Sequence, residues 1–552
     1  MSKISNIIIK KINGWRKIED KSKNILWIKG IVYNFTDLEI IKELNFNNNS
    51  KRLNSFINKI DGHFAFIFKD KYKIISVVDR VGSIPLFYLF NKSKYYITPF
   101  PSLIKKDFEK KLINYQVLSL SMSGYTIGEE SIYQNFKSIK GGFYTLFNLK
   151  YKKLQKISYN LYEAWKIDNK SSYKYLKKNL NKLNLKIIKK LYQFSLINKK
   201  KIAIPLSAGY DSRFIVSCLK ELGAKNVFCY SYGLKDNYEA KAAKKIANKL
   251  GYEWYFVELN NLKIFNSYRS KNFSNFSKIS DTFCSSADFM EFYVIEELHK
   301  KRLLKNCIIV NGNSGDFISG AHIPEYFNKG NDSQKIINSL TNAFINKHFK
   351  LWNSLATKNN NKIIYNLLID EIKNLKIYKK INKNNSHSIF EFLEFYNRQS
   401  KHVCSRQRIY EYFNYQWALP LWDKDYIDFW KKIRRKFKFK QKLYEDVLIE
   451  ENYANVWSGK KWKNLKSNII IVPKIFRYFI RPLAKLFFVF IGRSAWHKFE
   501  TRYILYFTDF VSSMGITKYQ KIINDNRGFR NSLSFHTEYY LKKKLKKFGE
   551  KL

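Results

Sequence analysis

Residues 201–232 contain a strand, a short polar turn, a helix and a second strand, and this order constrains the fold more than any other stretch. The apolar run IAIPL at residues 202–206 predicts a buried strand of a parallel sheet. After the turn at residues 207–212, apolar side chains recur at helical spacing, at Phe214, Ile215, Cys218 and Leu222. A second strand is predicted over residues 226–232. Strands that alternate with helices indicate a parallel α/β domain.

The turn between the first strand and the helix has the features of an anion site. A helix start presents free backbone N–H groups and the positive end of the helix dipole. Ser207 and Ser212 add hydroxyl donors. Asp211 does not favour a phosphate directly, but it can hold the magnesium ion that accompanies one. Taken alone, these residues also fit an ordinary capped strand–turn–helix, so both interpretations stay open at this point.

The hexapeptide SAGYDS at residues 207–212 resembles the SGGxDS pyrophosphatase loop of the asparagine synthetase family. Members of that family split ATP into AMP and pyrophosphate while they activate a carboxylate. Ala208 stands in place of the first glycine and adds a Cβ where a phosphate would approach the backbone. The resemblance implies that ATP binds a set of residues in and around this loop, namely Leu206, Ser207, Ala208, Gly209, Asp211, Ser212 and Ser231.

Length and composition indicate a folded protein with a basic surface. A chain of 552 residues predicts two or three domains, and 45% apolar residues exclude a disordered chain. The formal net charge of +56 suggests nucleic acid or an anionic membrane as a partner. However, the lysines are scattered along the chain, and the abundance of Lys, Asn, Ile, Phe and Tyr is typical of AT-rich codons. We therefore expect a solvated basic surface and no specific nucleic acid partner.

The cysteines and the N-terminus predict a cytoplasmic protein. The five cysteines show no CxxC and no metal spacing, and their apolar neighbours predict reduced, buried thiols. The first 15 residues lack an apolar core of signal-peptide length. No uncharged run is long enough to span a membrane.

Short apolar runs in the first hundred residues predict several closely spaced strands, as in a sheet sandwich. Three segments resemble, in order, the glutaminase half of asparagine synthetases: residues 30–34 (GIVYN), 61–66 (DGHFAF) and 79–88 (DRVGSIPLFY). The resemblance implies an Ntn-type αββα sandwich over residues 1–165. It implies that a parallel-sheet ATP-pyrophosphatase domain, of the adenine nucleotide α-hydrolase-like fold, follows over residues 170–465.

The sequence departs from the family where glutamine would be hydrolysed. The family nucleophile is a cysteine exposed by removal of Met1, and its own α-amino group is the base. Ser2 stands at that position, and no cysteine precedes Cys218. The family's oxyanion-hole asparagine corresponds to Lys29. We expect an inactive glutaminase-like domain that shapes or covers the second domain, while a glutaminase role for Ser2 is the alternative.

A second loop carries the other acidic residue of the predicted site. A predicted strand at residues 307–310 leads into NGNSGDFISG at residues 311–320, which resembles the family's GxGxDExxGGY. The resemblance implies that Gly312 contacts ATP. It also implies that Asp211 and Asp316 ligate Mg²⁺ on the pyrophosphate from opposite sides.

Two residues of this loop differ from the family pattern. Asn313 stands where asparagine-forming enzymes carry a glutamate and β-lactam-forming relatives a tyrosine, and Phe317 replaces a glutamate. Asparagine can orient a substrate but cannot act as a general base. We therefore expect an acceptor or nucleophile other than that of an ordinary asparagine synthetase. His322 follows the loop as a structural residue or a substrate contact.

The last segment covered by the resemblance ends at residue 463. Residues 419–423 (LPLWD) resemble the family's PFLD segment, and Lys442 matches the lysine that clamps the α-phosphate. The resemblance implies that the catalytic residues are Lys442, Asp316 and Asn313. Further helices are predicted over residues 170–200, 237–250 and 330–400.

A basic, apolar extension follows at residues 466–552. The apolar run at residues 469–492 is interrupted by Lys474, Arg477, Arg481 and Lys485, which argues against a membrane span. It fits an interfacial amphipathic helix or a helix packed on the body. With the tail LKKKLKK at residues 541–547, it makes peripheral contact with an anionic membrane one expectation.

Together, the motifs imply an ATP- and Mg²⁺-dependent ligase that forms an amide. It would activate a carboxylic acid as an acyl-adenylate, release pyrophosphate and transfer ammonia or an amine. The acceptor could be aspartate or a sugar acid destined for a surface polysaccharide, and Asn313 with Phe317 favours the latter. A hypothesis of another class is a non-catalytic basic protein that binds membrane or nucleic acid.

Overall fold

The computed structural model describes most of the chain up to residue 459 and parts of the remainder. The described residues are 5–8, 14–46, 49–91, 94–104, 111–235, 237–286, 289–325, 332–459, 462, 483, 486, 489–492, 516 and 532–546. Ser2 and most of the predicted amphipathic stretch at residues 469–492 lie outside them.

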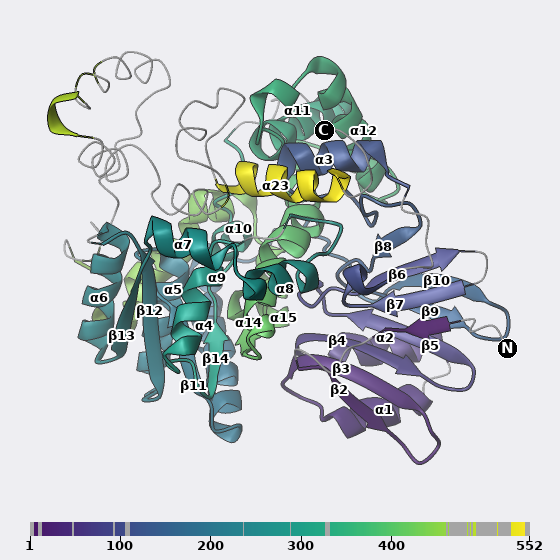
Figure 1. The fold of residues 1–552 in the computed structure, drawn as a ribbon, viewed down its shortest axis with the longest axis horizontal. Coiled ribbons are helices and arrows are strands. Elements are labelled where there is room, and N and C mark those ends of the chain that lie inside the picture. Colours follow the sequence, from purple (N-terminus) through teal and green to yellow (C-terminus); the bar gives the residue numbers. More distant parts are fainter. Residues whose placement is uncertain are drawn as a thin grey trace.

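The N-terminal domain contains two stacked β-sheets (Figure 1). The larger is antiparallel, in the order β10 (Lys153–Ser158), β9 (Phe143–Asn148), β5 (Lys73–Val78), β4 (Gly62–Lys69), β3 (Ile25–Val32) and β2 (Arg16–Glu19). The smaller has the order β1 (Ser5–Ile7), β7 (Lys94–Thr98), β6 (Phe87–Asn91) and β8 (Phe136–Ser138).

Helices cover the outer faces of both sheets. Helices α1 (Asp37–Phe46) and α2 (Ser50–Lys59) pack on the larger sheet, and α3 (Asn114–Ser123) packs on the smaller one. Side chains along β4 alternate between the two layers: Phe66 faces the helices and Ile67 faces the sandwich interior. Because both faces are buried, this strand is an uninterrupted apolar run in the sequence. The layer order is αββα, as predicted.

The second domain is built on a five-stranded sheet in which all neighbouring strands are parallel. Its order is β13 (Glu253–Glu258), β12 (Val227–Gly233), β11 (Lys201–Pro205), β14 (Cys307–Val310) and β15 (Gln416–Ala418). The predicted parallel α/β fold is therefore confirmed, and the two domains lie side by side (Figure 1).

The predicted helices of this domain form with small shifts in their ends. They are α4 (Tyr173–Ile197), α5 (Tyr210–Glu221) and α6 (Tyr238–Leu250), which ends at a left-handed Gly251. The apolar side of α4 is buried through Leu176, Leu180, Ile187 and Leu191. The predicted helical region 330–400 contains α11 (Ser333–His348), α12 (Lys358–Ile372) and α13 (Ser386–Glu394).

The other helices are mostly short. They are α7 (Asn261–Ser267), α8 (Lys271–Ile279), α9 (Phe292–Lys300), α10 (Gly315–Ser319), α14 (Arg408–Tyr412), α15 (Lys424–Trp430), α16 (Arg435–Lys438) and α17 (Lys442–Glu451). A π-helix, η4 (Phe395–Val403), continues directly from α13. Single 3₁₀ turns are η1 (Pro101–Leu103), η2 (Asn353–Leu355), η3 (Tyr378–Lys380), η5 (Cys404–Gln407), η6 (Pro420–Trp422), η7 (Phe439–Gln441) and η8 (Tyr453–Asn455).

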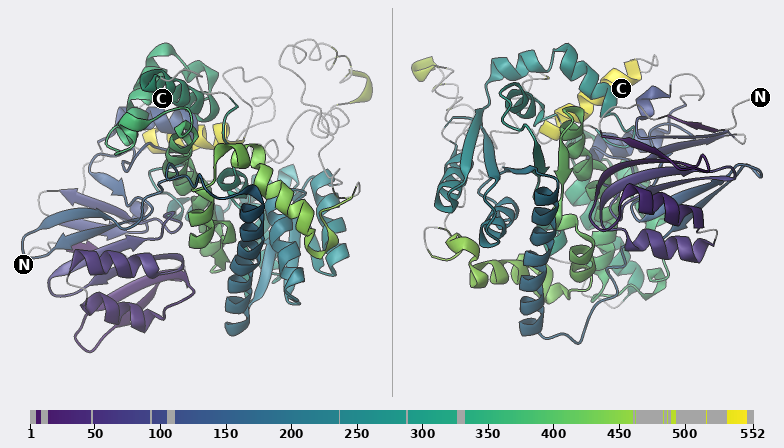
Figure 2. Two further views of the ribbon diagram at one scale, coloured as in Figure 1. Left: turned by 180° about the vertical axis from the view of Figure 1, so that it is seen from behind. Right: turned by 90° about the horizontal axis from the view of Figure 1, so that it is seen from below.

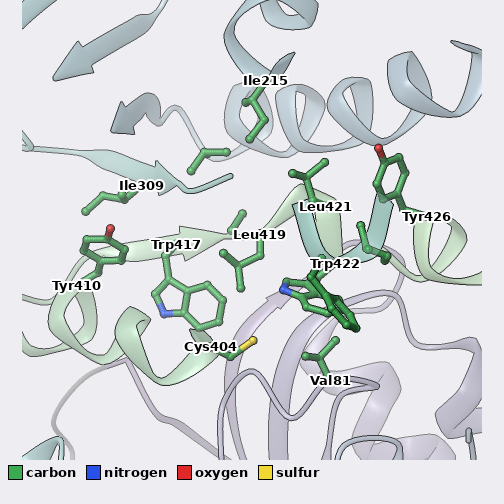
Figure 3. Packing of buried hydrophobic residues seen from close by; sticks show 14 of the residues in the cluster. Val81, Ile215, Ile309, Cys404, Tyr410, Trp417, Leu419, Leu421, Trp422 and Tyr426 are labelled. Atoms are coloured by element: carbon green, nitrogen blue, oxygen red, sulfur yellow. The ribbon is translucent and has the colours of Figure 1, made fainter. Parts of the chain in front are cut away.

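One buried cluster joins the two domains. Val81 of the N-terminal domain belongs to the same cluster as Trp417, Leu419 and Trp422 beside the parallel sheet (Figure 3). All five cysteines are buried free thiols, as the sequence predicted.

Ion pairs cross the same interface. Lys29 Nζ lies 2.7 Å from Glu411 Oε2, and each side chain is 6% exposed. Lys190 bridges Asp61 of the sandwich and Asp423 of the second domain, at 2.6 and 2.5 Å. Lys29, which stands at the family's oxyanion-hole position, therefore forms an ion pair between the two domains.

The C-terminal tail returns to the body of the protein. Helix α23 (Ser532–Lys546) lies beside α3 (Figures 1 and 2), and Leu541 and Leu545 are buried in the same cluster as Phe283. Tyr540 donates a hydrogen bond of 2.8 Å to Asp281. The apolar side of α23 thus faces protein. Peripheral membrane contact through residues 466–552 stays a prediction, since most of that stretch lies outside the described residues. Within the described part of the chain, no helix has the length and apolar character to cross a bilayer.

Candidate functional site

A cavity of about 390 Å³ lies where three neighbouring parallel strands end. Its lining residues lie at the ends of β11 and β12, in the loops and helix starts that follow β11, β12 and β14, just before α9, and in η4 and the turn after it. This is the edge of an α/β sheet at which ligands bind.

Most of the predicted site residues line this one cavity. They are Leu206, Ser207, Gly209, Asp211, Ser212, Ser231, Gly312, Asn313 and Asp316. Ala208 and Lys442 are not among the lining residues. The ATP-site prediction based on two distant loops therefore identified side chains that the fold brings together.

The first loop is held by its own serines. The Ser207 N–H donates to Ser212 Oγ at 3.1 Å, and the Gly209 N–H donates to Ser207 Oγ at 3.1 Å. Helix α5, which is described along its whole length, begins after Gly209 without a side-chain cap. The first N–H groups of α5 therefore have no side-chain acceptor from a cap, which is the arrangement that an anion-binding helix start requires.

Two glycines allow the loops to touch. A Cβ on Gly312 would lie 2.9 Å from the Cβ of Asp211, and a Cβ on Gly315 would lie 2.3 Å from Asp211 Oδ1. Any larger residue would push the second loop away from the first, so this close approach requires glycine at both positions.

Asp211 and Asp316 are adjacent. The backbone N–H of Asp316 donates to Asp211 Oδ2 at 3.1 Å, and Tyr444 Oη donates to Asp211 Oδ1 at 3.3 Å. Burial and the charge of Asp316 raise the pKa of Asp211 above its ordinary value. A cation at this position would relieve the repulsion between the two carboxylates.

The donor set fits magnesium that arrives with a nucleotide. Among the described residues, no group of three or more His, Cys, Asp or Glu side chains could hold a metal by itself. Mg²⁺ is commonly bound by one or two carboxylates together with substrate phosphates and waters. Asp211 and Asp316 supply the protein part of such a set.

His322 is joined to this carboxylate pair. Its Nε2 lies 3.0 Å from Asp316 Oδ2, and its Nδ1 lies 2.5 Å from Glu394 Oε1. Burial alone lowers the pKa of His322, but the charge of Glu394 and hydrogen bonds to Asp316 and Glu394 outweigh it and raise the pKa to about 9. The described structure thus favours a charged imidazolium between two carboxylates.

The two unusual loop residues lie in different environments. Asn313 lines the cavity, and its Nδ2 is buried without a hydrogen-bond partner in the described structure. Phe317 is fully buried, with its ring beside those of His322 and Trp422. Asn313 can therefore meet a ligand, whereas Phe317 belongs to the core.

Lys442 lies outside the cavity lining. Its ammonium is 2.9 Å from Asp446 Oδ2, one helical turn along α17, and its side chain is 54% exposed. Its assigned role at the α-phosphate remains a prediction.

Several lining residues were missed by the sequence reasoning. Acidic Glu239 and Glu291 line the cavity, as do Arg398, Gln399 and Arg406. Glu291 accepts hydrogen bonds from Tyr232 and Tyr410, at 3.0 and 2.7 Å. The sequence reasoning used none of these side chains: Arg406 lies at the start of the segment that ends in LPLWD, and the others lie in segments with no motif. No local signal distinguishes Arg398 from its polar neighbours in η4.

The fold and the cavity define an α/β protein with a candidate ligand site at the carboxyl ends of parallel strands and with a sandwich domain attached. Residues 195–448 match the family described as asparagine synthase. This match includes both loops whose motifs resemble that family in the sequence.

Individual relatives are distant. A probable glutamine-hydrolysing asparagine synthetase of Acanthamoeba polyphaga mimivirus is 22% identical over 267 residues. That match covers 43% of this chain and 44% of the viral protein, so the chain spans less than half the length of this relative.

Among solved structures, an ammonia-dependent NAD synthetase from Campylobacter jejuni is 16% identical, with a TM-score of 0.22, over 39% of this chain and 92% of that one. A glutamine phosphoribosylpyrophosphate amidotransferase from B. subtilis is 11% identical, with a TM-score of 0.19, over 44% and 73%.

Proposed function

We propose that the protein is an ATP-dependent ligase that activates a carboxylic acid by adenylation and converts it to an amide. The observation that carries this proposal is the juxtaposition of Asp211 and Asp316. They lie 105 positions apart in the sequence, follow two neighbouring strands, and meet in one cavity that α5 and the serines of the first loop also line.

The phosphates of ATP would lie over the first loop. The N–H groups at the start of α5 and the hydroxyls of Ser207 and Ser212 are donors for phosphate oxygens. Asp211 and Asp316 would hold the accompanying magnesium. When bound, that ion neutralises charge on the phosphates and favours departure of pyrophosphate.

The acceptor acid would lie on the side of the cavity formed by η4 and the turn after it. Arg398 and Arg406 line it, and a guanidinium group binds a carboxylate with paired N–H donors. The amide of Asn313 adds a donor beside them. We therefore propose an anionic acceptor, with aspartate and sugar acids as the classes to compare.

The reaction would have two steps. A carboxylate oxygen of the acceptor attacks the α-phosphorus of ATP, the bond to the β-phosphate bridge breaks, and pyrophosphate leaves. Ammonia or an amine then attacks the acyl carbon, AMP leaves with the transferred oxygen, and the nitrogen loses a proton. Free ammonia or an amine is the proposed donor, because Ser2 replaces the family's cysteine and Lys29 pairs with Glu411.

Pyrophosphate release from ATP and Mg²⁺ tests the proposal. Aspartate and several uronic acids would each be supplied with ammonium or with glutamine. We expect release with at least one acid, and a loss of about 100-fold or more in Asp211→Asn. Asp370→Asn, an exposed carboxylate paired with Lys373, serves as the matched control. Absence of release with every acid, unchanged by Asp211→Asn, would favour a non-catalytic basic protein.

A further inference from the structure

A closed circuit of hydrogen bonds supports the second loop from behind. Asp316 bonds to His322, and His322 bonds to Glu394. Gln399 Nε2 donates to Glu394 Oε1 at 2.9 Å, and Ser314 Oγ donates to Gln399 Oε1 at 2.6 Å. Since Ser314 and Asp316 are two positions apart, the circuit begins and ends on the same loop.

The loop needs this support. Ser314 has φ +70° and ψ +10°, in the left-handed region that disfavours a residue with a Cβ. It is also buried, so water cannot stabilise the conformation freely. The bond to Gln399 fixes its side chain, and the next glycine, Gly315, then lies against Asp211.

Glu394 is the centre of the circuit. Its side chain is 0% exposed, and it accepts hydrogen bonds from or pairs with His322, His348, Arg398 and Gln399. It is the last residue of α13, and the π-helix η4 follows at once. The wide turns of a π-helix are frequent at functional sites. In this chain they direct Arg398 and Gln399 back toward the carboxylate.

A purely structural role would require only that the buried carboxylate be satisfied. The circuit also connects Glu394 to the second loop, through His322 to Asp316 and through Gln399 to Ser314. In addition, Arg398, which pairs with Glu394, lines the cavity. Groups that orient metal-binding side chains commonly change metal affinity about 10- to 100-fold when they are removed.

We propose that Glu394 and Gln399 are positioning residues that hold Asp316 toward Asp211 through His322 and Ser314. This inference rests on the proposed function of the cavity. It assigns a role to residues outside the motifs of the two loops.

Mn²⁺ binding in the presence of pyrophosphate tests the inference without turnover. Free Mn²⁺ would be measured by electron paramagnetic resonance in full-length wild type, Glu394→Gln and Gln399→Ala. Both variants should raise the Mn²⁺ dissociation constant about 10-fold or more. His387→Gln, which alters a buried histidine on α13 outside the circuit, is the control and should bind Mn²⁺ as wild type does.

A second substitution separates loop geometry from general stability. Glycine adopts positive φ without strain, so Ser314→Gly should restore most of the Mn²⁺ affinity in Gln399→Ala. Thermal melting checks that each variant is folded. If Glu394→Gln does not fold, the comparison between Gln399→Ala and the double variant Gln399→Ala with Ser314→Gly tests the inference by itself. Failure of this restoration would mean that Gln399 does not act through the loop and would overturn the inference.

The outcomes separate the inference from the function on which it rests. Wild-type affinity in Gln399→Ala, and in Glu394→Gln where it folds, would overturn the inference and leave the ligase proposal standing. If wild type itself binds no Mn²⁺ with pyrophosphate, the proposed site fails, and the positioning role fails with it.

Discussion

The ionised form of Asp211 is unfavourable when no cation is bound, because the side chain is buried beside Asp316. Burial and the neighbouring Asp316 raise its pKa, so the folded protein holds a proton that the unfolded chain releases. The contribution of Asp211 to the free energy of unfolding therefore decreases as pH rises above the ordinary pKa of Asp. Such a cost is common at functional sites, where stability and activity oppose each other.

Asp211→Asn should stabilise the ligand-free protein while it removes activity. The amide keeps an oxygen for the Asp316 N–H and needs no proton, so it removes the cost of holding Asp211 protonated beside Asp316, which is about 1 kcal/mol or more at neutral pH. Urea unfolding should show this gain, and the gain should shrink as pH falls below the ordinary pKa of 3.8, where Asp211 is mostly protonated in both states. Equal or lower stability at pH 7.5 would contradict the electrostatic interpretation.

His387 provides a pH dependence away from the cavity. Burial, together with the positive charges of Lys438 and Arg435, lowers its pKa to about 3. Because the pKa of His387 is lower in the folded protein, its contribution to the free energy of unfolding is fully present above the ordinary pKa near 6.5. This contribution is lost as pH falls toward 3. Between pH 6.5 and 4.5 the loss amounts to about 2 kcal/mol.

His387→Gln should therefore lose less stability in acid than wild type does. The measurement is urea unfolding at pH 7, 5.5 and 4.5, with the exposed His299→Gln as the control. Parallel pH dependences in His387→Gln and wild type would contradict the prediction.

The placement of individual side chains in the cavity was predictable only where a local motif marks them. Asp211 and Asp316 were found because each follows a predicted strand within a loop of small residues. Lys442 occupies the matching motif position, yet Asp446 one turn away pairs with its ammonium. That competition depends on side-chain geometry, which the motif does not encode.

At the scale of single elements, the second loop of the cavity has little room for a larger side chain. A Cβ at Gly315 would lie 2.3 Å from Asp211 Oδ1 and 2.5 Å from a methyl carbon of buried Leu421. A Cβ at Gly209, in the first loop, would meet only Ser207 Oγ, at 3.2 Å, and a shift of a few tenths of an ångström would accommodate it. The two glycines thus differ in the free space beside them.

Gly315→Ala should destabilise the protein by about 1–3 kcal/mol, the usual cost of overpacking, and should displace Asp211. Gly209→Ala should change the free energy of unfolding by less than about 1 kcal/mol, because Gly209 has an ordinary extended backbone. Chemical unfolding of both variants is the measurement. Equal stability of the two would show that the loops are not packed as described.

Most strands and helices could be predicted, because their signals are local. The apolar run of β11, the helical spacing in α4 and the glycine that ends α6 each lie within a few residues. The π-helix η4 could not be predicted, since its altered hydrogen-bond pattern leaves no period in the sequence. Arg398 and Gln399, which it carries, were missed for that reason.

For the whole molecule, the domain interface depends on buried charges that no single segment reveals. Lys29 and Glu411 are far apart in the sequence, and each has apolar or mixed neighbours. The tail of α23 is similar: leucines four positions apart among lysines suit either a membrane surface or a protein groove. In the structure, Leu541 and Leu545 pack against protein, and this contact depends on residues far away in the sequence.

The Lys29–Glu411 pair should contribute specificity rather than net stability. Lys29→Met leaves the Glu411 carboxylate buried without its cation and should cost about 3–5 kcal/mol. Lys29→Met combined with Glu411→Gln removes both charges and should be less destabilised than Lys29→Met alone. Additive losses in this double-mutant cycle would show that the two side chains do not interact in solution.

The central claim is that the second domain adenylates a carboxylate, and oxygen transfer tests it most directly. The acceptor acid found by pyrophosphate release would be labelled with ¹⁸O in its carboxylate, and the products would be analysed by mass spectrometry. The account predicts one labelled oxygen in AMP for each amide formed, and no label in pyrophosphate. Label that appears in inorganic phosphate, or AMP without label, would contradict it.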